Sequence, residues 1–252
     1  MNKNYLKNKN ILISGGCGHI GQVITKFYAD NECNVYVLGT SLKKFNKIFK
    51  NTKNIFFIKH DYNIDKNLDK KIKSLDIQKI DVLINNAYFL KSSAPLENNI
   101  DDFVFSLKGT VGIYYQTIKA CYPLLKDGSK IINIGSMYGN IIPDFKMYEN
   151  ENSINPIEYG IGKAGVSHLT KYLGNYLAKD NINVNCVLPG AIPSREAKKD
   201  KKLMNEIKKR TPLNRLGKPE DLLGILFVLS TDYGNFITGQ CLTIDGGFSN
   251  KK

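Results

Sequence analysis

The chain has 252 residues, 42% of them hydrophobic, so it can bury a sizeable core within one α/β domain. Its 36 lysines and arginines exceed its 23 acidic residues by 13, but no recognition module accompanies this charge, which argues against nucleic-acid binding. No run approaches the roughly 18 apolar residues of a membrane span, and scattered cysteines and histidines, with no signal-peptide core, predict a cytoplasmic protein without a metal site.

Apolar runs alternate with amphipathic stretches along the chain. In chain order, the pattern predicts strand 10–14, helix 20–30, strands 34–39 and 55–59, helix 66–76, strand 81–85, helix 101–122, strand 130–135, helix 157–179, strand 183–188, helix 219–230 and strand 240–244. Strands separated by helical patterns indicate right-handed crossovers and a parallel sheet. We therefore predict a single domain over residues 1–252, a three-layer, Rossmann-like α/β fold with a doubly wound sheet of about seven strands.

A glycine-rich turn follows the first predicted strand. Gly15 and Gly18 follow the apolar run 11–13, and Gly21 comes directly after Ile20, where a helical pattern starts. Glycines let the backbone approach a phosphate, and the free N–H groups of a helix N-terminus favour its negative charge. A plain tight turn, with glycines chosen for positive φ, is the alternative. The flanking strand and helix favour a pyrophosphate site.

Tyr159 and Lys163 stand four residues apart in a predicted helix, so they share one face. An ammonium beside a phenol favours the phenolate. We therefore expect the pair to exchange a proton nearer neutral pH than free tyrosine, which titrates near ~10. Other polar motifs follow predicted strands, where ligands bind in such sheets: Asn85-Asn86-Ala87, Ser136 and Pro189-Gly190.

Together, these motifs resemble the compact branch of the short-chain dehydrogenase/reductase family, from about residue 8 to the C-terminus. The further matching pieces are Asp61, the segments 133–136 and 212–221, Thr238-Gly239-Gln240 and Asp245-Gly246-Gly247. The resemblance implies an oxidoreductase that transfers hydride between a nicotinamide cofactor and a carbonyl or alcohol substrate. It also implies a homodimer or homotetramer that pairs through helices 101–122 and 157–179.

The resemblance implies roles for individual residues. Tyr159 would exchange the proton with the substrate oxygen, Lys163 would hold the nicotinamide ribose, and Ser136 would stabilise charge on the same oxygen. Ser106 replaces an asparagine that commonly anchors a proton-relay water, and its hydroxyl would partly substitute. The residues expected at the cofactor are Gly15, Cys17, Gly18, His19, Ile20, Thr40, Ser41, Asp61, Asn86, Ala87, Tyr159, Lys163, Pro189, Gly190, Ile192 and Ser194.

Some positions depart from the family pattern. His19 and Tyr88 stand where glycines are usual, so His19 would either crowd a pyrophosphate or contact it. After the strand 34–39 no carboxylate is present to accept bonds from a ribose 2′-OH. Thr40 and Ser41 can donate hydrogen bonds there, and the lysines at 43 and 44 can neutralise a phosphate. This favours NADP(H), with NAD(H) as the alternative.

The segment between Ser136 and Tyr159 is the clue to substrate, because the separation of 159 − 136 = 23 is longer than the family usually shows. Its insertion at 143–152 resembles members linked to the modification of bacterial surface sugars and flagellin. With the basic stretch 195–210, inside a predicted substrate lid at about 190–217, it favours a polar or anionic substrate such as a sugar derivative. A 3-oxoacyl group on an acyl carrier, or a non-catalytic dinucleotide-binding regulator, are the alternatives.

Overall fold

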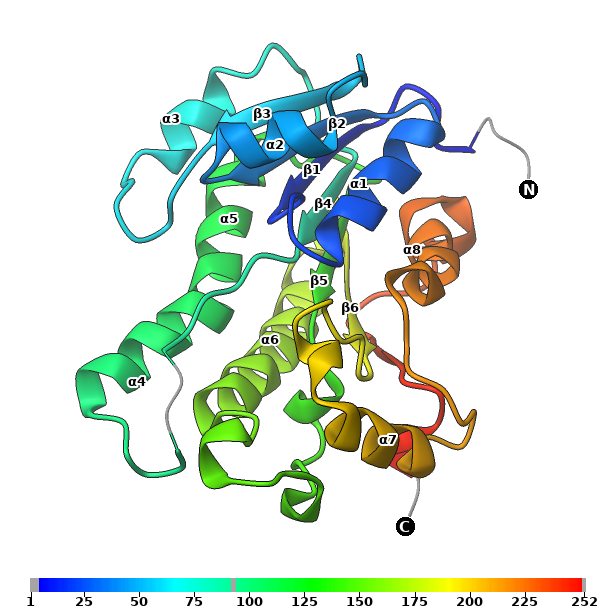
Figure 1. Cartoon of the computed structure of the whole chain (residues 1–252). Helices are drawn as coiled ribbons and strands as arrows, with labels where there is room; N and C mark the ends of the chain where they lie inside the picture. The colour runs from blue at the N-terminus through cyan, green and yellow to red at the C-terminus, as the bar shows by residue number, and fades with distance from the viewer. Residues whose placement is uncertain (1–4, 92–93, 251–252) are drawn as a thin grey trace.

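Seven parallel strands form one sheet in the order β3-β2-β1-β4-β5-β6-β7 in a computed structural model (Figure 1). The strands are β1 (Asn10–Ser14), β2 (Asn34–Gly39), β3 (Ile55–Lys59), β4 (Val82–Asn85), β5 (Lys130–Ile134), β6 (Asn183–Pro189) and β7 (Cys241–Ile244). The structure describes residues 5–91 and 94–250. Residues 1–4, part of the N-terminus from which the absence of a signal peptide was predicted, lie outside this range. The predicted doubly wound parallel sheet is confirmed.

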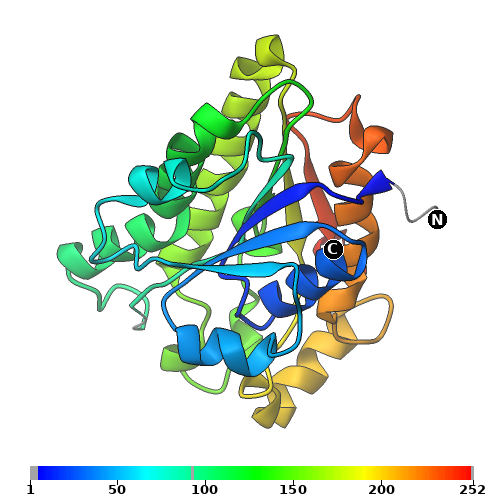
Figure 2. The same ribbon diagram turned by 90° about the horizontal axis from the view of Figure 1, so that it is seen from above.

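Helices cover both faces of the sheet (Figure 2). One layer consists of α1 (Gly21–Asp30), α2 (Leu42–Ile48) and α8 (Leu223–Ser230), and the other of α3 (Leu68–Lys73), α5 (Ile113–Cys121) and α6 (Ile157–Tyr176). Each layer packs on its own hydrophobic cluster, with the strands between them. The central strands β4 and β5 are buried on both sides, as a covered parallel sheet requires.

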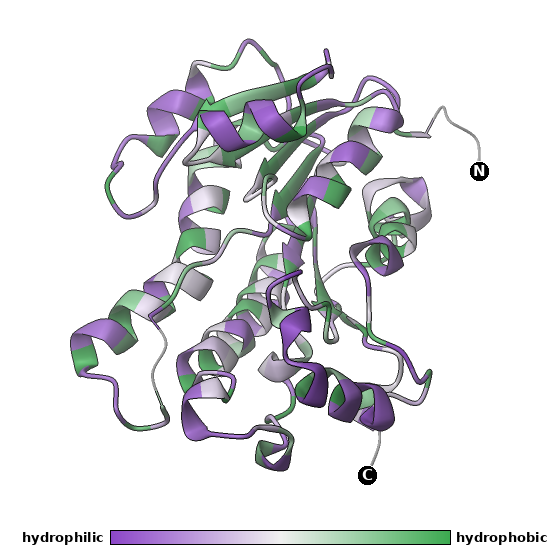
Figure 3. Ribbon diagram, in the orientation of Figure 1, coloured by the Kyte–Doolittle hydropathy of each residue, from purple (hydrophilic) through white to green (hydrophobic). Residues whose placement is uncertain are grey.

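Hydropathy follows this layering. Figure 3 shows green, hydrophobic ribbon in the central strands and α8, against largely purple, hydrophilic ribbon in α2 and α3. Among the helices of the described ranges, none is both long and apolar enough to span a bilayer.

The predicted helix 101–122 is instead two α-helices joined by a π-helical turn. The segments are α4 (Ile100–Leu107), the turn Lys108–Gly112, and α5. The loop after β4 explains the break, because the Phe89 amide donates to the Gly109 carbonyl at 3.0 Å. Phe89 leaves no room for a side chain at 109, where a Cβ would lie 2.0 Å from its carbonyl oxygen. Such an intrusion into the hydrogen-bond ladder bends a helix.

Two helices were not predicted, α2 and α7 (Lys201–Arg210). Both are rich in lysine, so their apolar positions are few and the helical period is hard to recognise. In α7 the side chain of Asp200 caps the helix by accepting from the Leu203 amide at 2.9 Å. Its apolar side chains Met204 and Ile207 are buried, and its lysines face outward.

Candidate active site

A cavity of about 930 Å³ opens at the carboxyl ends of the strands, the edge where doubly wound sheets bind ligands. Its wall includes every predicted site residue except Ser106: Gly15, Cys17, Gly18, His19, Ile20, Thr40, Ser41, Asp61, Asn86, Ala87, Ser136, Tyr159, Lys163, Pro189, Gly190, Ile192 and Ser194. The topology thus gathers residues from the ends of β1 to β6 around one space.

The glycine turn after β1 is held close to the end of β4. Gly15 adopts a φ of +68°, and a Cβ at Gly21 would lie 2.2 Å from the Gly15 carbonyl oxygen. The Asn86 side chain donates to that same oxygen at 3.1 Å, while the Ser14 hydroxyl accepts from the Asn86 amide at 3.0 Å. Only glycine permits so close a chain path at these two positions.

This turn fits a pyrophosphate. Ile20 precedes the first turn of α1, and no side chain among the described residues caps that turn. The amides of Gln22 and Val23 donate to the carbonyls of Gly18 and Ile20 at 3.0 and 3.1 Å. An anion would therefore meet the glycine turn itself, at the positive end of the helix dipole. His19 is exposed on the cavity wall, and the interior of the turn is formed by backbone.

The end of β2 brings polar groups to the cavity. The Ser41 hydroxyl caps α2 by accepting from the Lys44 amide at 3.2 Å. Lys44 lines the cavity, whereas Lys43 is not among its wall residues. Burial raises the pKa of the Cys17 thiol in the glycine turn, and the Lys44 ammonium partly offsets this effect, so its charge reaches the turn. Thr40, Ser41 and Lys44 together form a pocket wall suited to an anion.

The end of β3 supplies Asp61 and a neighbour that sequence reasoning missed. Asp61 lines the cavity, and its Oδ1 accepts from the Asn63 amide at 2.9 Å. His60 also lines it, is 1% exposed, and has its Nδ1 3.5 Å from Asp65 Oδ2. Burial lowers the pKa of His60, so its imidazole is neutral at physiological pH. Its place directly before Asp61 was the only signal in the sequence.

Ser136 and Tyr159 converge at the other end of the cavity. Ser136 lies two residues after the end of β5, and its hydroxyl accepts from the Tyr138 amide at 3.1 Å. Tyr159, in the first turn of α6, lies close to this hydroxyl. Burial raises the pKa of Tyr159 to about 12, although the neighbouring Ser136 hydroxyl opposes the change. The phenol therefore holds its proton at neutral pH.

Lys163 lies one turn further along α6 and is 2% exposed. Its Nζ donates to the Ile134 carbonyl at 2.7 Å and to the Tyr114 hydroxyl at 3.1 Å, and lies 5.7 Å from the Tyr159 ring centroid. Burial lowers its pKa to about 8. The expected lowering of the Tyr159 pKa by Lys163 is wrong for this structure, because desolvation of the phenol outweighs other influences.

Ser106 is not brought to the cavity. It is fully buried in α4, where its hydroxyl accepts from the Lys91 amide at 3.0 Å and donates to the Lys91 carbonyl at 3.3 Å. Its own carbonyl accepts from the Thr110 hydroxyl at 2.9 Å. These bonds fix the loop after β4 against the bend between α4 and α5.

Pro189, Gly190, Ile192 and Ser194 continue the wall after β6. The Gly190 amide donates to the Ile244 carbonyl at 2.9 Å, which ties this wall to β7. The Ser194 hydroxyl accepts from the Ala197 amide at 3.2 Å. This stretch leads directly towards α7.

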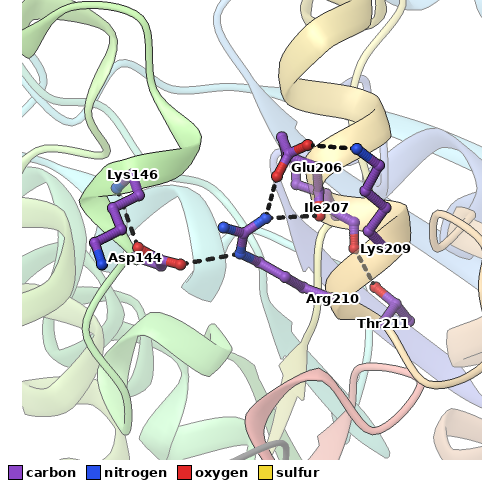
Figure 4. Close-up of polar contacts among 7 residues, drawn as sticks. All are labelled: Asp144, Lys146, Glu206, Ile207, Lys209, Arg210 and Thr211. Atoms are coloured by element: carbon purple, nitrogen blue, oxygen red, sulfur yellow. Dashed lines mark hydrogen bonds and ion pairs between the residues drawn. The ribbon is translucent and has the colours of Figure 1, made fainter.

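The insertion 143–152 and α7 meet over the cavity, and we call these two segments the roof. Figure 4 shows Arg210 between them: its Nε is 2.9 Å from Asp144 Oδ2, and its Nη1 also pairs with Glu206. Beneath these ion pairs lies a small hydrophobic cluster of Met137, Met147, Met204, Ile207 and Phe248. The roof is therefore joined by both charge pairs and apolar packing.

Polar side chains line the cavity below the roof. Tyr138 and Tyr148 lie near each other on this wall, and Ser153 and Asn155 follow along it. The Asn155 Oδ1 is buried and has no hydrogen-bond partner within the described ranges. A buried acceptor without a partner is costly unless a ligand or water satisfies it. Asn155 is a second residue that sequence reasoning missed, since an asparagine in a loop carries no pattern.

The chain is similar to known proteins over almost its whole length. A family model described as enoyl-(acyl carrier protein) reductase matches residues 18–249. The 3-oxoacyl-(acyl-carrier-protein) reductase FabG of Chlamydia trachomatis is 27% identical over 254 residues, covering 97% of this chain and 98% of the relative. Post-translational flagellin modification protein A of Campylobacter coli is 29% identical over 262 residues, covering 96% and 99%.

A solved structure is similar over almost the whole length. It is the short chain dehydrogenase from Leptospira borgpetersenii with bound NAD+, 29% identical, with a TM-score of 0.86. The match covers 99% of this chain and 96% of that one.

Proposed function

Because the chain belongs to the short-chain dehydrogenase/reductase family, we propose that it interconverts a carbonyl and an alcohol with Ser136, Tyr159 and Lys163 as its catalytic residues. The family consists of NAD(P)-dependent oxidoreductases, and this chain shares their fold. One observation carries the assignment of residues. Ser136, Tyr159 and Lys163 line the same cavity as the glycine turn, with Ser136 close to Tyr159.

Each side chain has a task that its surroundings support. In reduction, Tyr159 donates its proton to the substrate oxygen, and its pKa of about 12 keeps that proton available at neutral pH. Ser136 donates a hydrogen bond to the same oxygen as negative charge develops. Lys163 uses two of its three N–H donors for Tyr114 and Ile134, so one remains for the ribose hydroxyls. The nicotinamide, when bound, supplies or accepts the hydride.

The cofactor we favour is NADP(H), with NAD(H) as the alternative. Thr40 and Ser41 offer hydroxyls, and Lys44 offers a positive charge on the cavity wall beyond β2. A 2′-phosphate would be neutralised by that lysine, whereas a carboxylate that would bind a free 2′-OH does not follow β2. Asp61 is proposed to receive the adenine amino group.

For the substrate we favour a polar or anionic carbonyl compound, such as a sugar derivative. The wall below the roof carries the hydroxyls of Tyr148 and Ser153 and the unpartnered Asn155 Oδ1, which suit a substrate with several polar groups. One relative is a flagellin modification protein.

A 3-oxoacyl group on an acyl carrier is the second candidate. It is favoured by the apolar side chains that α7 adds to the cavity, Leu203, Met204 and Ile207, and by the match to FabG. The lysines on the outer face of α7 would meet an acidic carrier equally well.

The segment 190–217 is proposed to act as a lid, and the chain to assemble with copies of itself. Large apolar side chains are exposed on the outer helices: Ile100 and Val104 on α4, and Ile161 on α6. A second copy that covers α4 to α6 would bury them, which supports a homodimer or homotetramer. Light scattering that finds a monomer at all concentrations would contradict this assembly.

The test measures NADPH oxidation against sugar-derived ketones and 3-oxoacyl thioesters, with Tyr159→Phe beside the parent. Removing the proton donor should lower kcat/KM by about a thousandfold and leave NADPH affinity nearly unchanged. Tyr172→Phe, at an exposed position on the same helix, is the matched control. Equal rates for parent and Tyr159→Phe would reject the catalytic assignment. NADPH binding without turnover of any carbonyl would instead favour a non-catalytic regulator.

A further inference from the structure

Lys163 is a buried, positively charged side chain that lacks, in the described part of the chain, the carboxylate partner such a charge usually has. Within residues 5–91 and 94–250 no carboxylate forms an ion pair with it, and burial holds its pKa near 8. The titratable groups that face it are Tyr88 of the loop after β4, Tyr114 of α5, Tyr159 of α6 and Cys186 of β6. Aromatic faces and oxygen dipoles must therefore stabilise the ammonium.

Tyr114 has the closest contact of the three rings. The Lys163 Nζ lies 5.0 Å from its ring centroid and donates to its hydroxyl at 3.1 Å. The Tyr114 hydroxyl in turn donates to the Ile134 carbonyl at 2.8 Å, and Lys163 donates to that same carbonyl at 2.7 Å. These bonds join the ammonium, the phenol and the last residue of β5 in a closed triangle.

The direction of these bonds is fixed by burial. Tyr114 is fully buried, and desolvation raises its pKa far above the ordinary value, so its proton stays on the oxygen. The hydroxyl therefore always donates to Ile134 and offers its lone pairs to Lys163. Tyr114 is absent from the cavity wall, so it touches neither cofactor nor substrate.

We infer that Tyr114 is a positioning residue, which holds the Lys163 ammonium at the end of β5 in the orientation that the cofactor and Tyr159 require. This inference rests on the proposed function, since it explains how Lys163 is oriented for that reaction. Tyr114 is the second residue of α5, just after the π-helical turn Lys108–Gly112.

The experiment compares Tyr114→Phe with Tyr115→Phe. Tyr115 is the next residue of α5, is 54% exposed and does not line the cavity, so its hydroxyl serves as the matched control. In the parent, kcat should fall above about pH 8, as Lys163 loses its proton. Tyr114→Phe keeps the ring and removes an acceptor from the ammonium. The alkaline limb should therefore move about one pH unit lower, with a loss in kcat/KM of about tenfold near pH 8.

A second readout needs no turnover. NADPH affinity, followed by the fluorescence of the bound nicotinamide, should weaken severalfold in Tyr114→Phe and show the same shift with pH. In a Lys163→Met background, Tyr114→Phe should have no further effect on NADPH affinity, because the two residues act as one unit. A melting temperature close to the parent's would exclude a general loss of folding.

The outcomes separate the two proposals. If the parent neither binds NADPH nor turns over a carbonyl, the proposed function fails. If the parent is active and Tyr114→Phe has the pH profile and NADPH affinity of Tyr115→Phe, the positioning role of Tyr114 is overturned. An effect of Tyr114→Phe that persists unchanged without Lys163 would also overturn it.

Discussion

The two sides of the cavity are built by different means. On the cofactor side, backbone meets backbone: the turn at Gly15 and Gly21 leaves no room for a Cβ. On the substrate side, the roof is joined by side-chain ion pairs, and Arg210 and Asp144 remain 27% and 43% exposed. Exposed pairs stabilise by only ~0–1 kcal/mol, whereas a steric clash in a packed turn costs ~1–3 kcal/mol. The cofactor side therefore tolerates few substitutions, whereas the residues of the roof can be substituted at little cost in stability.

The largest effect should come from filling the glycine turn. In Gly21→Ala the new Cβ would lie 2.2 Å from the Gly15 carbonyl oxygen. The turn must therefore open, and its amides would no longer point towards the pyrophosphate. We expect NADPH affinity to fall about a hundredfold, as measured by fluorescence titration. Gly224→Ala is the control, because nothing lies within 4 Å of its Cβ position in α8, and it should stabilise the fold by ~0.5–1 kcal/mol. Equal NADPH affinity in both variants would show that the cofactor side does not depend on the close packing at Gly21.

A smaller effect is expected at the end of β2, where the cofactor side does depend on a side chain. Lys44→Ala removes a charge from the cavity wall, so NADPH should bind about tenfold more weakly while NADH is little affected. Lys43→Ala, one residue earlier and off the wall, keeps the same net charge as Lys44→Ala. If both variants lower the NADPH preference equally, general surface charge and not the position of Lys44 is responsible.

The smallest effect should come from the roof. Arg210→Gln breaks the pairs to Asp144 and Glu206, and KM for the substrate should rise about two- to fivefold with little change in kcat. High salt should reduce the difference from the parent, since exposed pairs are screened. Lys208→Gln, two residues away, carries the same charge change and serves as control. A fall in melting temperature as large as that of Gly21→Ala would show that the roof is structural after all.

Much of the cofactor side could be predicted from the sequence, whereas the joints of the roof could not, and the reason is physical. Buried parallel strands such as β4 appear as apolar runs, and the turn from Gly15 to Gly21 needs glycine, so both leave local patterns. Nothing local marks the pair Asp144–Arg210, whose partners are 66 residues apart. Tyr114 likewise follows from a distant packing relation, since its contact with Lys163 spans 49 residues.

The charge state of Tyr159 is another property that the sequence alone did not predict. Its spacing from Lys163 predicted that they share a helix face, but not that burial would raise the phenol's pKa. Desolvation depends on every neighbour in space, so it becomes visible only when the fold is known.

The small hydrophobic cluster under the roof contains every methionine of the chain apart from Met1, namely Met137, Met147 and Met204. Thioether side chains are unbranched and flexible, so this cluster between the insertion and α7 can repack around ligands of different shape. The same sulfurs are the sites at which oxidants add oxygen and turn an apolar contact polar. Oxidation of these methionines should therefore weaken substrate binding well before it disturbs the sheet.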